Sequence, residues 1–188
     1  MSNLKDYVMQ IPALSEGVCQ SVVSELEKQK WTEHTFSEYD GTKVYKPYKE
    51  TCETILNGTS IDSLVMDSLY KPIQHYVTKL GQPYFKSWSG YTPVKYNKYK
   101  TGKSMEKHID HIYDIFDNDI GIPKGIPTLS IIGVLNNDYS GGAIEMFKDT
   151  KYNLKAGELL IFPSIFLYPH KVCEVTKGTR YSFVSWVY

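Results

Sequence analysis

The chain has 188 residues, a length that suits one folded domain and leaves little room for two independent ones. Its 21 basic and 21 acidic side chains cancel, so no overall charge favours nucleic acid, an anionic membrane or a strongly charged partner. The three cysteines are scattered and form no Cys-x-x-Cys pair, which argues against a disulfide framework and against a thiolate metal site.

The N-terminus shows no basic start followed by an apolar run of signal-peptide length. No stretch of the chain approaches the roughly 20 consecutive apolar residues of a membrane span. We therefore expect a soluble, cytoplasmic protein without a membrane partner. The sequence gives no indication of an oligomeric state.

Two helices are predicted in the first half of the chain. Ser15 can cap the first, in which apolar residues recur every four positions from Val18 to Leu26 and which we expect to end near 30–31. A second helical pattern begins at Ser60 and is stopped by Gly81, with Pro72 expected to kink or split it. Its inward residues are predicted to be Ile61, Leu64, Val65, Leu69, Ile73, Tyr76 and Leu80.

From Tyr84 onward the pattern changes to short, β-type runs separated by glycine- and asparagine-containing turns. Many short strands preceded by helices indicate an antiparallel barrel or sandwich that is supported by an N-terminal helical layer. The predicted strands are Tyr84 to Tyr91, Pro93 to Tyr99, Thr128 to Leu135, Ala143 to Phe147, Glu158 to Phe162, Tyr168 to Val175 and Arg180 to Tyr188.

The segment 111–127 interrupts this rhythm, because it is acidic at first and then rich in glycine and proline. It is long for a barrel connection, so we interpret it as a functional loop that could act as a lid. A solvated surface loop is the alternative.

Lysines alternate with aromatic side chains between Lys95 and Lys107. Such a pattern can bind single-stranded nucleic acid. A solvated strand face explains the same pattern with fewer assumptions.

Four residues together carry a recognisable chemistry. On a strand, residues two apart point to the same face, so His108 and Asp110 are expected to project together into the barrel. His170 lies on a much later strand and is the natural third ligand, since two histidines and one carboxylate form the facial triad of non-haem iron(II) oxygenases. Arg180 is the single arginine among 21 basic side chains. Its planar fork can grip a carboxylate with two parallel hydrogen bonds.

The residues around this set resemble the C-terminal signature of the prolyl 4-hydroxylase-like branch of iron(II)/2-oxoglutarate oxygenases. The resemblance rests on the block from Phe162 through Tyr168-Pro169-His170 to Arg180-Tyr181. It is extended by Tyr99 and Gly102 before His108, by Gly141-Gly142, by Lys155 to Phe162 and by Trp186. It covers 91–188 well and the N-terminal half only in its helical outline.

The resemblance implies a mainly β fold with N-terminal helices and a double-stranded β-helix (jelly-roll) core. Residues 1–90 form a helical support layer integral to that fold, and residues 91–188 form the oxygenase core. Iron(II) is implied to bind His108, Asp110 and His170, and the distal carboxylate of 2-oxoglutarate is implied to bind Arg180.

Other contacts of the cosubstrate are predicted less directly. Tyr99 matches a tyrosine that helps to bind 2-oxoglutarate in relatives, with a packed sheet aromatic as the alternative. Oxygen-sensing members carry a second such tyrosine where this chain has Val134. The further candidate hydroxyl donors are Thr128, Ser130 and Ser182.

The predicted function is that of a dioxygenase that uses iron(II), 2-oxoglutarate and dioxygen, with ascorbate as a further candidate cofactor, and releases succinate and carbon dioxide. The predicted substrate is a peptidyl proline or a comparable side chain on a peptide or protein. One alternative is a nucleobase or nucleotide oxygenase, which is disfavoured because repair-type relatives carry a second arginine that this chain lacks. The other is a non-catalytic jelly-roll binding module.

Overall fold

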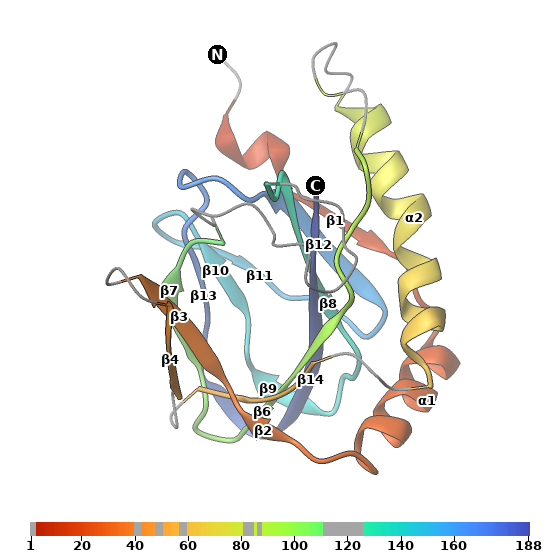
Figure 1. Cartoon of the computed structure of the whole chain (residues 1–188), viewed down its shortest axis with the longest axis vertical. Helices are drawn as coiled ribbons and strands as arrows, with labels where there is room; N and C mark the ends of the chain where they lie inside the picture. Colours follow the sequence, from red (N-terminus) through yellow and green to blue (C-terminus); the bar gives the residue numbers. More distant parts are fainter. Residues whose placement is uncertain are drawn as a thin grey trace.

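Two antiparallel sheets face each other, and two helices cover the outer face of the larger sheet (Figure 1). The computed structural model describes residues 3–39, 43–47, 51–56, 60–80, 85, 88–110 and 126–188, with only the backbone described for 36–39 and 43–47. The larger sheet has the order β1-β12-β8-β14-β6-β5-β2, with β9 also paired to β14. The smaller sheet has the order β11-β10-β13-β7, and β3 and β4 form a separate hairpin. The expected mainly β fold is thus confirmed.

The elements have the following bounds. The helices are a short 3-10 helix at Leu4–Tyr7, α1 at Glu16–Leu26 and α2 at Asp62–Lys79. The strands of the first half are β1 (Met9–Pro12), β2 (Thr32–Glu33), β3 (Thr35–Tyr39), β4 (Lys43–Pro47), β5 (Glu53–Leu56), β6 (Lys95–Lys100) and β7 (Met105–His108). The later strands are β8 (Leu129–Val134), β9 (Tyr139–Gly141), β10 (Ile144–Met146), β11 (Thr150–Tyr152), β12 (Glu158–Pro163), β13 (His170–Val172) and β14 (Val175–Val187).

The first helix follows the sequence prediction at its start. The Ser15 side chain accepts a hydrogen bond from the backbone N–H of Val18 and so caps α1. The helix ends at Leu26, several residues earlier than expected, and its buried face consists of Cys19, Val22 and Leu26. Val18 is only partly buried, since it lies beside this face.

The second helix differs from the prediction in two respects. It runs unbroken from Asp62 to Lys79, so the expectation that Pro72 splits it is wrong. Pro72 is itself buried and packs on the inward side of α2. Leu64 was predicted to point inward, yet 45% of its surface is exposed. The predicted stop at Gly81 lies outside the described residues.

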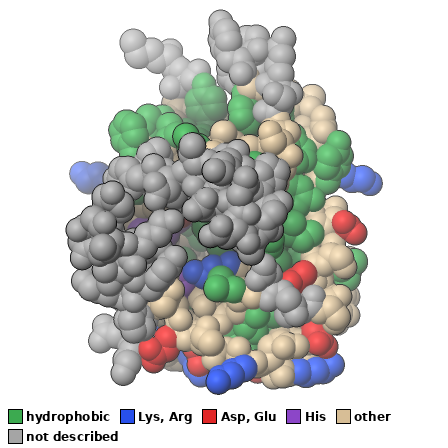
Figure 2. Space-filling model, viewed as in Figure 1, with side chains coloured by type: hydrophobic (Ala, Val, Ile, Leu, Met, Phe, Trp, Pro, Cys, Tyr) green, Lys and Arg blue, Asp and Glu red, His purple; other side chains and the backbone are tan. Residues whose placement is uncertain are grey.

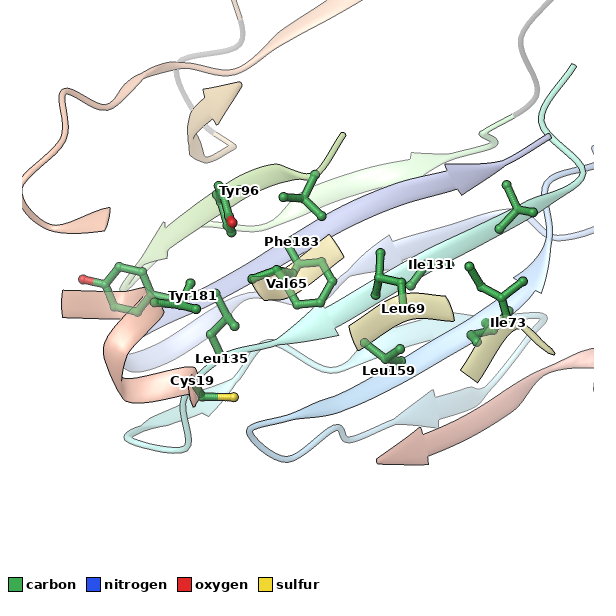
Figure 3. Close-up of a cluster of buried hydrophobic side chains, with 14 of the residues drawn as sticks. Cys19, Val65, Leu69, Ile73, Tyr96, Ile131, Leu135, Leu159, Tyr181 and Phe183 are labelled. Atoms are coloured by element: carbon green, nitrogen blue, oxygen red, sulfur yellow. The ribbon is translucent and has the colours of Figure 1, made fainter. Parts of the chain in front are cut away.

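The main hydrophobic core lies between the helices and the larger sheet. In Figure 3, Val65, Leu69 and Ile73 of α2 lie over Ile131 of β8 and Phe183 of β14. All six residues of β8 are buried, because helices cover one face of this strand and the smaller sheet covers the other. A second apolar cluster, which includes Ile132, Val134, Ile144, Met146, Leu160 and Phe162, fills the space between the two sheets.

Some strand predictions need correction. The expected strand 84–91 is not formed in its described part, where Tyr91 makes a single bridge to Val187. The last strand begins at Val175, five residues before the predicted start, because Lys177 and Gly178 pair with β9 instead of forming the expected turn. The pairing is irregular only between Val175 and Lys177. Residues before 91 also contribute β1, β2 and β5 to the larger sheet. The predicted lid lies outside the described residues up to position 125.

No helix in the described part of the chain is long and apolar enough to cross a membrane.

Candidate active site

Three side chains of metal-ligand type meet at the edge of the smaller sheet. His108 ends β7 and is directly opposite His170, the first residue of β13, in the strand register. The sequence predicted that Asp110 projects from the same strand as His108. In the structure β7 ends at His108, so Asp110 projects from the chain two residues beyond the strand. The potential ligand atoms of the three residues all lie within 4.8 Å of one another.

The two histidine rings are held by the same kind of backbone contact. His108 Nδ1 lies 2.8 Å from the carbonyl oxygen of Glu106, and His170 Nδ1 lies 3.2 Å from that of Tyr168. A carbonyl oxygen can only accept, so each Nδ1 carries the proton and each Nε2 presents a lone pair. These lone pairs face Asp110, whose Oδ1 lies 3.6 Å from His108 Nε2 and 3.8 Å from His170 Nε2.

His170 is the more enclosed of the two histidines. Only 2% of its surface is exposed, and the ring of Phe162 packs edge-on against it at 5.0 Å between centroids. Burial lowers the pKa of His170, while the carboxylate of Asp110 acts in the opposite sense. A neutral imidazole of this kind is the form that binds a metal ion.

Arg180 lies inside the barrel on β14, with 1% of its surface exposed. Its Nη1 donates a 2.8 Å hydrogen bond to Ser182 Oγ, and its guanidinium carbon lies 5.3 Å from the centre of the Tyr99 ring. Its Nε and Nη2 are also buried but have no hydrogen-bond partner among the described residues. A buried cation with two unused donors is costly, so the geometry suits an anion that accepts both hydrogen bonds.

Backbone geometry makes room for this arginine. Gly142 has φ +65°, and a Cβ atom placed there would lie 2.7 Å from Arg180 Cδ. The glycine pair recognised in the sequence therefore lets Arg180 pack directly against the chain. Beside it lies a pocket of about 250 Å³, whose lining includes Arg180, Val134 and Ile144.

The structure brings some of the predicted cosubstrate residues together and leaves others apart. Tyr99 lies directly opposite Arg180 in the pairing of β6 with β14, and Ser182 contacts Arg180 as described above. Ser130 instead hydrogen-bonds Ser164 at 2.7 Å, near the other end of β8. Thr128 donates to the carbonyl oxygen of Val187, which lies seven residues along β14 from Arg180. Neither Ser130 nor Thr128 lies beside Arg180.

Two pocket residues were not predicted from the sequence. Tyr139 and Tyr152 line the pocket beside Arg180. They lie next to Val134, the position at which oxygen-sensing relatives carry a second tyrosine. Tyr139 directly follows an Asn-Asn-Asp turn, and the sequence analysis assigned it no role. Tyr152 belongs to β11, a strand of three residues that no periodicity indicated. The tyrosine that directly precedes the small residues 140–143 is the signal that could have identified the first.

The donor set fits a ferrous ion with a dicarboxylate beside it. Two imidazole nitrogens and one carboxylate oxygen converge within ligand range, which is the arrangement typical of non-haem iron(II) sites. The unused donors of Arg180 fit one end of a carboxylate. The fold and this set of side chains together define an oxygenase of the iron(II)- and 2-oxoglutarate-dependent class.

Comparison with known proteins agrees with this class. Residues 94–188 match the family model of the 2OG-Fe(II) oxygenase superfamily, and the chain belongs to that family. A PKHD-type hydroxylase of Prochlorococcus marinus (strain NATL1A) is 35% identical over 99 residues, which are 50% of this chain and 40% of the relative. The match thus spans less than half the length of that relative.

Solved structures share the fold at low sequence identity. The viral collagen prolyl hydroxylase of Paramecium bursaria Chlorella virus-1, in complex with 2-oxoglutarate, superposes with a TM-score of 0.66 at 17% identity, covering 96% of this chain and 94% of the other. A Trichoplax adhaerens prolyl hydroxylase bound to a peptide of hypoxia inducible factor gives a TM-score of 0.69 at 16% identity, covering 97% and 83%. These likenesses confirm the double-stranded β-helix predicted for the core.

Proposed function

We propose that this protein is a dioxygenase that hydroxylates a carbon centre, most simply a proline side chain in a peptide, and converts 2-oxoglutarate to succinate and carbon dioxide. The observation that carries the proposal is the convergence of His108, Asp110 and His170 in the same barrel as a buried arginine with two unused donors. The peptide substrate is supported by the prolyl hydroxylases that share the fold, one of them bound to a peptide.

In this proposal His108, Asp110 and His170 are the protein ligands of iron(II). When bound, iron(II) and 2-oxoglutarate supply the chemistry that splits dioxygen between succinate and the hydroxylated product. The carbonyl groups of Glu106 and Tyr168 hold the two imidazoles in the tautomer that offers Nε2. These three side chains would hold iron(II), and the bound ion would supply the remaining coordination sites that cosubstrate and dioxygen need.

Arg180 is proposed to bind the far carboxylate of 2-oxoglutarate through Nε and Nη2. Ser182 fixes the guanidinium by accepting from Nη1, so the fork is already oriented before the cosubstrate arrives. Burial raises the pKa of Tyr99 well above its usual range, so its hydroxyl stays neutral and can donate to the same cosubstrate. Val134 and Ile144 contribute an apolar part of the pocket wall beside Arg180.

The test is turnover by the purified protein supplied with iron(II), ascorbate, 2-oxoglutarate and proline-containing peptides. We expect succinate release together with a product one oxygen atom heavier than the peptide, and no release from an Asp110→Ala variant. Failure of the wild-type protein to bind 2-oxoglutarate in the presence of iron(II), and to release succinate with any peptide, rejects the proposal. Binding of iron(II) and 2-oxoglutarate without decarboxylation would instead identify a non-catalytic module.

A further inference from the structure

The lysines of β6 fall into two groups that face opposite sides of the larger sheet. Lys98 and Lys100 share the outer face of the strand. Lys98 pairs with Glu27 at 2.7 Å, and Lys100 pairs with Glu53 at 2.8 Å. Lys95 has the opposite parity, which places it on the inner face together with Asn97 and Tyr99. Both outer lysines thus have a carboxylate partner, Lys98 in a partly buried ion pair and Lys100 in an exposed one, whereas Lys95 points into the barrel.

Lys95 differs from the other two because no carboxylate is paired with it. It is only partly exposed, and it makes no hydrogen bond or ion pair with a described residue. Burial lowers its pKa, and the charges of Cys52 and Asp110 act in the opposite sense. Asp110 is the one carboxylate among the groups that act on the pKa of Lys95, and in the proposed function Asp110 is bound to iron. Within the described part of the chain Lys95 is therefore a partly buried cation without a carboxylate partner, which is an unfavourable arrangement unless an anion is supplied.

A buried histidine stands beside this lysine. His34 is 6% exposed, and its backbone N–H donates to the carbonyl oxygen of Cys52 at 3.0 Å, which fixes it next to β5. Burial first, and then the charges of Lys95 and His108, lower the pKa of His34 to about 3. His34 therefore lies within electrostatic reach of both Lys95 and His108. At neutral pH it is an uncharged hydrogen-bonding group.

The position of Lys95 separates it from the cosubstrate anchor. In the strand register Lys95 lies beside Val184, whereas Tyr99 lies beside Arg180. Four strand residues at about 3.3 Å each put roughly 13 Å between the two positions along β6. Lys95 and Arg180 thus lie at different positions along the inner face of the sheet, and the charge of Asp110 reaches both Lys95 and Tyr99.

We propose that Lys95, with His34 beside it, forms a subsite for a carboxylate of the substrate next to the carbon that is hydroxylated. This inference rests on the proposed function and narrows the substrate to one that is anionic near its reacting carbon. Two sources share this chemistry: the free C-terminal carboxylate of the residue that is hydroxylated, and the acidic side chain of a neighbouring residue.

Matched probes distinguish the two sources. The first pair is N-acetyl-proline and N-acetyl-prolinamide, and the second is a blocked hexapeptide with an internal Pro-Asp step and the same peptide with Pro-Asn. Affinity is measured by calorimetry under anaerobic conditions on protein loaded with iron(II) and 2-oxoglutarate, so that binding is read without turnover. Succinate and product mass are then measured in air with the same probes.

Lys95→Met is the informative variant, because it keeps the length of the side chain and removes the charge. Lys100→Met is the matched control from the same strand, since it removes an exposed lysine on the outer face. We expect the anionic member of at least one pair to bind at least tenfold more tightly than its neutral partner. This preference should disappear in Lys95→Met and persist in Lys100→Met. Thermal midpoints of both variants establish that they are folded, and Lys95→Met should be at least as stable as the wild type.

The outcomes separate this subsite from the proposed function. A neutral probe that binds as well as its anionic partner in both pairs, or a preference that survives in Lys95→Met, overturns the subsite. An anionic preference that depends on Lys95, without hydroxylation of any probe, supports the subsite and counts against proline as the target. If Lys95→Met does not fold, Lys95→Gln provides the same comparison.

Discussion

Arg180 is the residue on which the cosubstrate site depends. It is buried, and Ser182 uses one of its donors while two remain unused. Lysine keeps the charge but lacks the planar fork, so it cannot make two parallel hydrogen bonds to one carboxylate. We expect Arg180→Lys to raise the KM for 2-oxoglutarate by about 10- to 100-fold, as the loss of a charged hydrogen bond worth about 1.5–3 kcal/mol predicts. Steady-state succinate release checks this, and an unchanged KM would show that the fork is not used.

Gly142 leaves the space that the side chain of Arg180 occupies. Gly142 and Gly102 both have positive φ, at +65° and +82°, so alanine strains the backbone at either position. Only at position 142 does the new Cβ also meet Arg180, since nothing lies within 4 Å of a Cβ at position 102. Gly142→Ala should therefore weaken 2-oxoglutarate binding, and Gly102→Ala should lower the thermal midpoint alone. Equal cosubstrate affinities in the two variants would contradict this role.

At the scale of elements, α2 stabilises the larger sheet from outside the barrel. Leu69 is fully buried in the main core, whereas Leu64 on the same helix is 45% exposed. Leu69→Ala should lower the free energy of unfolding by about 2–5 kcal/mol. Leu64→Ala should change it by less than about 0.5 kcal/mol. Urea unfolding followed by circular dichroism measures both, and comparable losses would show that the helix is oriented differently.

The strands show how far local sequence patterns could predict this fold. The runs around Ile131, Leu160 and Phe183 were predictable because long apolar or alternating segments reflect burial on one or both faces. Short strands such as β9 and β11 were not, because their three residues are held by pairing with distant partners rather than by local preference. The split that was predicted at Pro72 does not occur, because a helix can accommodate a buried proline when tertiary packing stabilises it.

The residues of the site that could be predicted are those whose chemical type alone indicates a role. His108, Asp110 and His170 were selected by ligand type and spacing, and the structure brings them together across the β7–β13 register. Lys95 and Tyr152 were not selected, because their proximity to the site arises from strand parity and pairing between segments far apart in the chain. Strand parity separates Lys95 from Lys98 and Lys100, but the sequence alone did not indicate which face of this strand is turned toward the site.

At the scale of the whole molecule, a buried histidine should link stability to pH. The pKa of His34 is about 3 in the folded chain, against about 6.5 for an unfolded histidine. Above pH 6.5 neither state binds this proton. Between these values only the unfolded state binds it, so stability falls as the pH falls, by about 1.4 kcal/mol per pH unit at the steepest. Urea unfolding of the metal-free protein between pH 7.5 and 4.5 should show a shallower decline for His34→Asn, and parallel curves would contradict the assignment.

Different parts of the barrel divide the proposed work. In this proposal Arg180 binds the cosubstrate, His108 and His170 of the smaller sheet bind the metal, and Lys95 binds an anionic group of the substrate. Each part is contributed by a different strand, so the relative placement of the groups depends on the packing of the two sheets against each other.

The decisive measurement is the rate of 2-oxoglutarate decarboxylation by Arg180→Ala, with bound iron(II) and the circular dichroism spectrum determined on the same sample. Because the three proposed ligands lie on β7, β13 and the residues after β7, and not on β14, we expect iron binding and the fold to be retained. Turnover should fall to background, since the carboxylate of the cosubstrate has lost its anchor. Decarboxylation at the wild-type rate would contradict the assignment of Arg180 and of the site built around it.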